Sequence, residues 1–168
     1  MFNKIDKLSE TEFIEVFGNI FENASWIAQK LYKQKPFQNF QDLSEKMISI
    51  FENANNQNKL KIFNSHPDLA DKAKIGSLTP ASNKEQSNIG LDQCTEKEFN
   101  EFKNLNLEYK NKFTFPFIIA VKGRNKLEIL VNFQKRVLSN KKIEFDEAVK
   151  QVKQIANLRL DELKVKFL

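Results

Sequence analysis

The chain has 168 residues, of which 40% are hydrophobic and 29% are charged, a composition that excludes an intrinsically disordered protein and fits one globular domain over residues 1–168. Its single cysteine excludes a disulfide within the chain and, with the single histidine, a zinc or iron–sulfur site built from His and Cys side chains. No apolar run approaches the ~20 residues that a membrane helix needs, and the 27 basic residues are scattered among 22 acidic ones, which favours a solvated surface over a nucleic-acid-binding one.

The spacing of apolar residues predicts an all-α protein, a single compact bundle of about eight helices. Only four glycines and four prolines interrupt the chain, and 16 phenylalanines supply core material. Ser9 and Glu12 form a capping box that predicts the start of the first helix, and Phe13 and Phe17 continue it at helical spacing. Further helices are predicted around residues 26–31, over residues 41–54, and just ahead of His66.

The stretch from His66 to Gly90 holds the residues best suited to chemistry. It contains the only histidine and two of the four prolines. Because Pro67 suits the first position of a helix, we expect a helix over residues 67–74. The positive end of its dipole would lie near His66 and lower the affinity of the imidazole for a proton.

A polar cluster follows in the same stretch. Thr79 and Pro80 are expected to form a turn, after which Ser82 and Glu85 have the spacing of a capping box. This box predicts a helix that begins near Ser82, carries Glu85 in its first turn and ends at Gly90.

The second half of the chain alternates long helices with one apolar segment. Thr95 and Glu98 form a third capping box, which heads a helix to about residue 112. Residues 115–121 have the composition of a buried strand, but no other segment resembles a partner strand. We therefore expect a buried extended or partly helical segment whose spare backbone groups can bind a ligand. Helices are predicted over residues 125–138 and 144–164.

Few side chains can carry a reaction. His66 is the natural proton carrier near neutral pH, while Glu85 is explained equally well as a helix cap, and Gln86 is free to face a pocket. Arg159 lies on the apolar stripe of the last predicted helix, which suggests recognition of a carboxylate or a similar planar group. Cys94 paired with His66 as a thiol nucleophile has no local support. These residues fit a cofactor-free proton-transfer site.

The motifs resemble one family over nearly the whole chain and in the right order. The chain is similar to the 2-oxo-4-hydroxy-4-carboxy-5-ureidoimidazoline (OHCU) decarboxylase family. The residues that carry this resemblance are His66-Pro67-Asp68-Leu69-Ala70, Leu78-Thr79, Ser82-x-x-Glu85-Gln86, Gly90-Leu91, Tyr109-x-x-x-Phe113-x-Phe115-Pro116-Phe117-Ile118 and Ile155-Ala156-x-x-Arg159-Leu160, with Leu8-Ser9-x-x-x-Phe13 and Trp26-Ile27-Ala28 near the start.

The resemblance implies an all-helical homodimeric carboxy-lyase that converts OHCU to (S)-allantoin, the last step of urate degradation, without metal or cofactor. His66 would be the catalytic acid, Glu85 would orient it, and Arg159 would bind the anionic part of the substrate. The substrate pocket would be lined by Pro67, Ser82, Asn83, Lys84, Glu85, Gln86, Phe117, Ile118, Ile119, Ala120 and Val121.

Three positions depart from the family pattern. Thr114 stands where glycine is usual, Ile89 stands where a small residue is common, and residues 136–140 follow the RLxN form only loosely. Two alternatives therefore stay open: the same fold acting on another small ureido or carboxylated heterocycle, and a non-catalytic helical interaction module.

The expected compartment is the cytoplasm. Residues 1–13 lack the apolar core of a signal peptide. A single cysteine suits a reducing environment. We expect a small-molecule substrate and neither a nucleic acid nor a membrane as partner.

Overall fold

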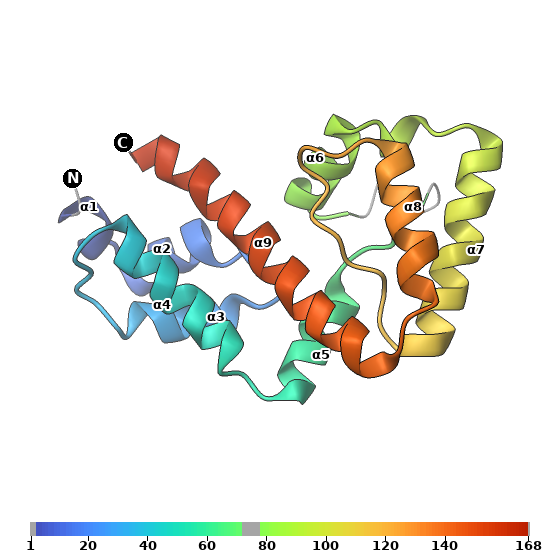
Figure 1. Ribbon diagram of the computed structural model, residues 1–168. Coiled ribbons are helices and arrows are strands. Elements are labelled where there is room, and N and C mark those ends of the chain that lie inside the picture. Colours follow the sequence, from blue (N-terminus) through green and yellow to red (C-terminus); the bar gives the residue numbers. More distant parts are fainter. Residues whose placement is uncertain (1–2, 72–77, 168) are drawn as a thin grey trace. The chain divides into compact units, whose positions relative to one another are not determined.

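Every regular element in the described part of the chain is a helix. Figure 1 shows the computed structural model, which describes residues 3–71 and 78–167. The predicted all-α class is confirmed for these residues, which contain no strand. The chain divides into two compact units, residues 1–65 with 152–168 and residues 66–151, and the helix α9 (Lys141–Phe167) contributes to both. The single domain over residues 1–168 stays a prediction.

The first unit is a small bundle around phenylalanine side chains. Phe13, Phe17 and Phe51 are completely buried in it. The predicted capping box is confirmed, since the Ser9 backbone N–H donates to the Glu12 carboxylate at 2.8 Å and Ser9 Oγ accepts from the Glu12 N–H at 3.3 Å. Besides the end of α9, the unit contains α1 (Asn3–Asp6), α2 (Glu10–Phe17), α3 (Ser25–Tyr32), α4 (Phe40–Glu52) and α5 (Asn56–Ser65).

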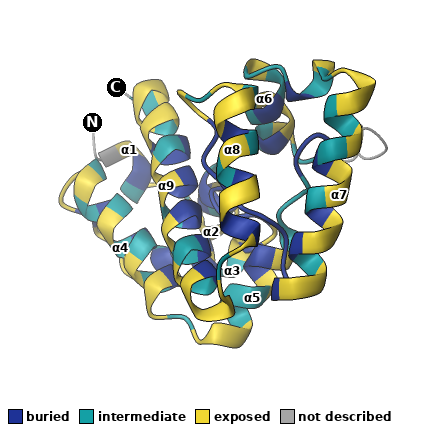
Figure 2. Ribbon diagram, turned by 45° about the vertical axis from the view of Figure 1, so that its right-hand side comes forward, coloured by how far each residue is buried: buried dark blue, intermediate teal, exposed yellow. Residues whose placement is uncertain are grey.

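The second unit contains the histidine and the helices that follow it. These are α6 (Pro80–Asn88), the short 3-10 helix η2 (Leu91–Gln93), α7 (Glu96–Phe113), α8 (Lys126–Val137) and the first part of α9. Capping boxes open α7 at Thr95, as predicted, and α8 at Asn125. Both helices are buried on one side and exposed on the other (Figure 2), the pattern of helices that cover a core.

A buried segment without helix or strand follows α7. Residues 115–121 are all buried, and they run through the second unit as an extended coil (Figure 1). The prediction of a buried extended segment is confirmed, whereas the alternative of a partly helical one is not. The Phe117 ring stacks on Phe133 with 3.9 Å between ring centroids, and the Tyr109 ring meets Phe117 edge-on at 5.4 Å. Aromatic packing therefore holds the segment between α7 and α8.

The predicted start of α6 is wrong. Thr79 is the N-cap, since its hydroxyl accepts from the Ser82 backbone N–H at 3.3 Å, and Pro80 occupies the first turn. A threonine followed by proline is a good helix start, because proline lacks an N–H that would otherwise need a partner there. Ser82 is thus the third helical residue rather than the cap. Glu85 lies in the second turn, so capping does not account for it.

Thr114 ends α7 in a conformation that favours glycine, with φ +69°. The left-handed region costs a residue with a side chain about 1–2 kcal/mol, more than the entropic cost of glycine. Thr114→Gly is therefore expected to raise the free energy of unfolding by about 0.5–1 kcal/mol in a urea titration. Leu138, which caps α8 at φ −82°, is the matched control, and Leu138→Gly is expected to destabilise. A loss of stability in Thr114→Gly would contradict this account.

Candidate functional site

His66 directly follows the last residue of α5 and is half-buried, with its Nε2 atom shielded from solvent. The predicted helix after it is wrong for the described residues, because residues 67–71 are not helical; residues 72–74 lie outside the described part of the chain. Residues 67–71 therefore form no helix whose dipole could lower the proton affinity of His66. What shapes this loop instead is a set of side chains from α6 and α7.

Two amide side chains bind the backbone after Pro67. Gln86 Oε1 accepts from the Ala70 N–H at 3.1 Å, Gln86 Nε2 donates to the Asp68 carbonyl at 3.3 Å, and Asn106 Nδ2 donates to the Leu69 carbonyl at 3.0 Å. A helix would need these backbone groups for its own hydrogen bonds. Ala70 has a φ of +52°, which is also incompatible with a helix. Tertiary hydrogen bonds thus override the local helix signal of Pro67.

An ion pair adds a further anchor to the loop. Lys110 Nζ lies 2.6 Å from Asp68 Oδ2, and the Asp68 side chain is only 10% exposed. Lys110 and Asn106 are both on α7, one turn apart, so one face of this helix holds the loop. Sequence reasoning missed both residues. Asn106 was detectable as a polar residue within the apolar stripe of Phe102, Tyr109 and Phe113.

The residues from Ser82 to Gln86 differ in how far they are buried. Ser82 and Gln86, four residues apart on α6, are 4% and 6% exposed and share the buried face of the helix. Glu85 is half-buried, while Asn83 and Lys84 are exposed. Gln86 was expected to be free for a pocket, but its amide holds the loop that begins at His66. Gln86 therefore holds α6, the helix that also carries Glu85, beside the His66 loop within the second unit.

Side chains of α8 and α9 bind the backbone of residues 117–121. Arg136 Nη1 donates to the Ile118 carbonyl at 2.8 Å, and Gln151 Oε1 accepts from the Ala120 N–H at 2.8 Å. Arg124 Nε donates to the Ala120 carbonyl at 3.1 Å. The Val121 carbonyl also accepts from the Arg124 backbone N–H, at 3.0 Å, so at least four of the backbone groups expected to be spare for a ligand are engaged by the protein itself.

A buried carboxylate orients Arg136. Glu144 is 1% exposed, and its Oε2 accepts from Arg136 Nε at 3.0 Å and from the Tyr109 hydroxyl at 2.5 Å. The guanidinium carbon lies 4.3 Å from the centre of the Phe117 ring, a cation–π contact. Burial, and next the hydrogen bond to Glu144, raise the pKa of Tyr109 well above its usual range.

The raised pKa of Tyr109 predicts a loss of stability at high pH. The native state keeps a phenolic proton that the unfolded chain releases near pH 10, so the free energy of unfolding should fall above pH 10 by about 1.4 kcal/mol per pH unit. Tyr109→Phe removes this contribution and leaves every lysine unchanged. Urea titrations between pH 8 and 11 should therefore show a steeper fall for the wild type than for Tyr109→Phe. Equal slopes would contradict the assignment.

Arg159 lies in the other unit and has a protein carboxylate as partner. Its Nη2 donates to Glu22 Oε1 at 2.9 Å, with side-chain exposures of 8% and 1%, and its Nη1 donates to the Ile20 carbonyl at 3.2 Å. The expectation that this arginine recognises a carboxylate is met within the chain by Glu22. No sequence signal identified Glu22, which is 137 residues away. A substrate-binding role for Arg159 stays a prediction.

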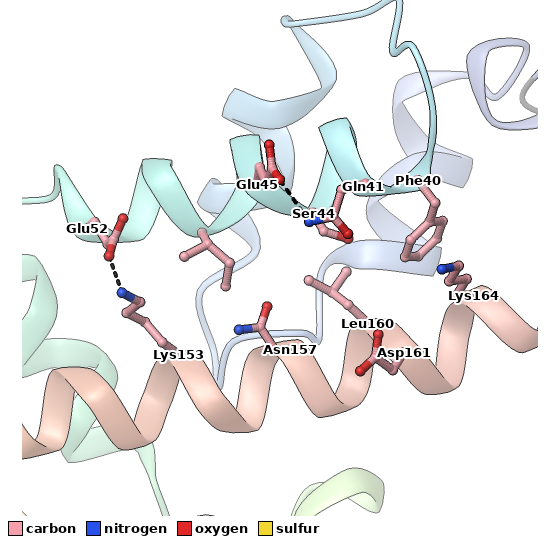
Figure 3. Close-up of a pocket in the computed structure, with 11 residues that line it drawn as sticks. Phe40, Gln41, Ser44, Glu45, Glu52, Lys153, Asn157, Leu160, Asp161 and Lys164 are labelled. Atoms are coloured by element: carbon pink, nitrogen blue, oxygen red, sulfur yellow. Dashed lines mark hydrogen bonds and ion pairs between the residues drawn. The ribbon is translucent and has the colours of Figure 1, made fainter.

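The described residues also form two open hollows, and no predicted site residue lines either of them. In the first unit, a groove of about 510 Å³ lies between α4 and α9 (Figure 3), with Leu160 on one wall and the Glu52–Lys153 ion pair near one end. In the second unit, a hollow of about 560 Å³ is lined by Asp68, Ala70 and residues of α7. Neither is the site that the motifs predict.

The described residues contain neither a cluster suited to a metal ion nor a helix suited to a membrane. No group of three or more His, Cys, Asp or Glu side chains in residues 3–71 and 78–167 is arranged to hold a metal ion. In the same ranges, no helix is both long and apolar enough to cross a membrane.

Several known proteins are similar to this chain over nearly its whole length. The OHCU decarboxylase family model matches residues 6–161. A 2-oxo-4-hydroxy-4-carboxy-5-ureidoimidazoline decarboxylase of Haloferax volcanii is 32% identical over 95% of this chain and 93% of its own length, and that of Xenopus laevis is 33% identical over 96% and 93%. A uric acid degradation bifunctional protein of Bacillus sp. (strain TB-90) is 39% identical over 95% of this chain, which spans only 31% of that protein.

A solved structure supports the same assignment. The crystal structure of (S)-allantoin synthase superposes with a TM-score of 0.77 at 25% identity, over 97% of this chain and 54% of that chain. The family match, the relatives that it covers almost end to end and the shared fold all agree with the His66 and Gln86 motifs. The chain belongs to the OHCU decarboxylase family.

Proposed function

We propose that the chain decarboxylates OHCU to (S)-allantoin. The observation that carries the proposal is a pair of hydrogen bonds that links the two family motifs. The Gln86 side chain binds the backbone of Asp68 and Ala70, and so fixes the loop that begins at His66 to the helix that carries Glu85. The family match over residues 6–161 supports the choice of substrate. An acid and a carboxylate on rigid neighbouring elements are what a proton transfer with defined direction needs.

The reaction needs orientation and a proton rather than an external electron acceptor. As the bond to CO₂ breaks, its electron pair passes into the adjacent C=N bond of the imidazoline ring, and a proton is then added at the ureido-bearing carbon. His66 delivers this proton to one face of the ring, and Glu85 orients the imidazole. Arg159 holds the anionic part of the substrate as a planar donor. Protonation from one side fixes the stereochemistry of the product.

The remaining candidate residues bind the heterocycle. We assign this role to Pro67, to the run from Ser82 to Gln86 and to residues 117–121. Ser82 is buried, which supports a binding role for it. Asn83 and Lys84 are exposed, which gives the same role less support for them. No step of this scheme requires a metal or an organic cofactor, and we propose that the enzyme uses none.

Two further proposals concern the assembly and the compartment. We propose a homodimer, as the family resemblance implies, and Leu127 and Val131 offer an apolar surface for it, since they lie one turn apart on α8 and are 68% and 53% exposed. We propose the cytoplasm as the compartment, because a single half-buried cysteine suits reducing conditions.

The proposed activity is tested with OHCU generated enzymatically and followed by its ultraviolet absorbance. The full-length protein, dialysed against a chelator, is expected to accelerate the loss of absorbance in proportion to its concentration. Salt-sensitive binding of DNA by the same sample would favour an interaction module instead. A loss of absorbance that proceeds at the rate of the buffer control would contradict the proposal.

A further inference from the structure

We infer that Arg136 and Gln151 are positioning residues, which fix the backbone of residues 117–121 in the conformation that binds the substrate heterocycle. This inference rests on the proposed function, in which that backbone lines the pocket. It adds residues that the motif comparison did not assign to the site. They come from two different helices, α8 and α9, and each acts on the segment through a direct hydrogen bond.

The two residues bind the segment two positions apart. Arg136 donates to the carbonyl of Ile118, and Gln151 accepts from the N–H of Ala120, each at 2.8 Å. In an extended chain the backbone groups of residues i and i+2 point to the same side, and those of the residue between them point to the opposite side. The protein therefore engages Ile118 and Ala120 on one side of the segment. On the other side the Val121 carbonyl accepts from the Arg124 backbone N–H at 3.0 Å, and the backbone groups of Phe117 and Ile119 are those we assign to the ligand.

The anchors are themselves held in place. Arg136 donates to Glu144 Oε2 at 3.0 Å, and this oxygen also accepts from the Tyr109 hydroxyl. Gln151 Nε2 donates to Glu147 Oε1 at 2.8 Å, which fixes the orientation of the amide. Each anchor thus has one bond to the segment and a second bond that restricts its own rotation. Side chains locked in this way hold a binding group in a narrow range of positions.

Stability alone does not explain the arginine. Arg136 is 8% exposed, and its Nη2 is buried without a hydrogen-bond partner among the described residues. Replacing a buried ion pair with apolar side chains is often neutral or stabilising, because burying two charges is costly. A buried, incompletely satisfied guanidinium that binds the Ile118 carbonyl is therefore better explained by the position it gives to the backbone.

The test compares variants that remove each anchor with a variant that keeps it. Arg136→Met and Gln151→Met remove the bonds to Ile118 and Ala120. The double variant Gln151→Glu with Glu147→Gln instead keeps an acceptor for the Ala120 N–H and an amide–carboxylate bond between positions 147 and 151. Both methionine variants are expected to raise KM for OHCU at least tenfold with kcat changed less than about threefold, since a displaced backbone weakens binding before it affects proton transfer. The double variant Gln151→Glu with Glu147→Gln should stay near the wild type. Lys112→Met is the control, since Lys112 also donates to a backbone carbonyl, that of Val137, at 2.8 Å.

A second readout does not depend on activity. Amide hydrogen exchange of residues 117–121 is expected to become at least tenfold faster in both methionine variants and to stay unchanged in Lys112→Met. If Arg136→Met does not fold, the Gln151 pair gives the same comparison alone. Wild-type KM and unchanged exchange in folded Gln151→Met would overturn the inference. A wild-type protein inactive on OHCU would instead overturn the proposed function, while hydrogen exchange would still decide whether the anchors hold the segment.

Discussion

Replacing His66 with asparagine is expected to lower kcat/KM for OHCU by a factor of about 10²–10⁴, the usual contribution of a positioned acid or base. Asparagine keeps a polar side chain of similar reach but cannot deliver a proton at neutral pH. The loop should stay in place, because Gln86 and Asn106 hold its backbone. Steady-state kinetics of the two proteins at equal folded concentration measure the effect.

The control for this variant is a substitution in the same unit that touches no candidate residue. Gln93, exposed at the end of η2, serves for this purpose, and Gln93→Ala should keep full activity. Thermal unfolding of His66→Asn within a few degrees of the wild type would show that the fold is intact. Turnover by folded His66→Asn at the wild-type rate would mean that another group supplies the proton.

Removing Arg159 is expected to have the largest effect on stability. Arg159→Ala leaves the Glu22 carboxylate buried without its ion-pair partner, and breaking such a pair typically costs about 3–5 kcal/mol of the free energy of unfolding. Replacing both residues, as in Glu22→Leu with Arg159→Met, should restore most of this loss, because no uncompensated charge remains. Urea titrations of the single and double variants measure both effects.

The same double variant separates the structural role of Arg159 from its proposed role in binding. If Arg159 also holds the substrate, the double variant should be stable but strongly impaired, and Arg159→Lys should be impaired as well, since a point charge cannot reproduce a planar fork. Near-wild-type turnover in the stable double variant would remove Arg159 from the site. A cost below about 1 kcal/mol for Arg159→Ala would contradict the buried ion pair.

Local signals in the sequence predicted the helices well. The capping boxes at Ser9 and Thr95 need only residues three positions apart, and both are present in the structure. The start of α6 was wrong because two valid signals overlap there, and Thr79 followed by Pro80 prevailed over Ser82. The helix expected after Pro67 was wrong because side chains from α6 and α7 bind the backbone of that loop.

The candidate site was predicted less completely than the fold. The motifs make His66, Glu85 and Gln86 candidates, but periodicity cannot predict that the amide of Gln86 binds the backbone of Asp68 and Ala70. Glu22 was missed because its partner is far away in sequence and nothing local marks it as buried. Contacts of this kind follow from tertiary packing, which composition and spacing do not encode.

The departures at Thr114 and Ile89 leave the proposed acid and carboxylate in place. Thr114 is exposed at the end of α7, and its left-handed backbone keeps the shape that glycine would give. Ile89 ends α6 before Gly90, whose φ of +78° makes the turn into η2. Both positions affect turns rather than groups that transfer a proton. They therefore give no reason to prefer a different heterocycle over OHCU as the substrate.

The optical activity of the allantoin formed from OHCU tests the central claim most directly. In buffer alone, protonation of a planar intermediate by an achiral solvent gives both enantiomers equally. With enough protein that the catalysed reaction dominates, circular dichroism of the product is expected to show nearly pure (S)-allantoin. Racemic allantoin under those conditions would contradict an enzyme that places the ring and the proton donor in a fixed arrangement.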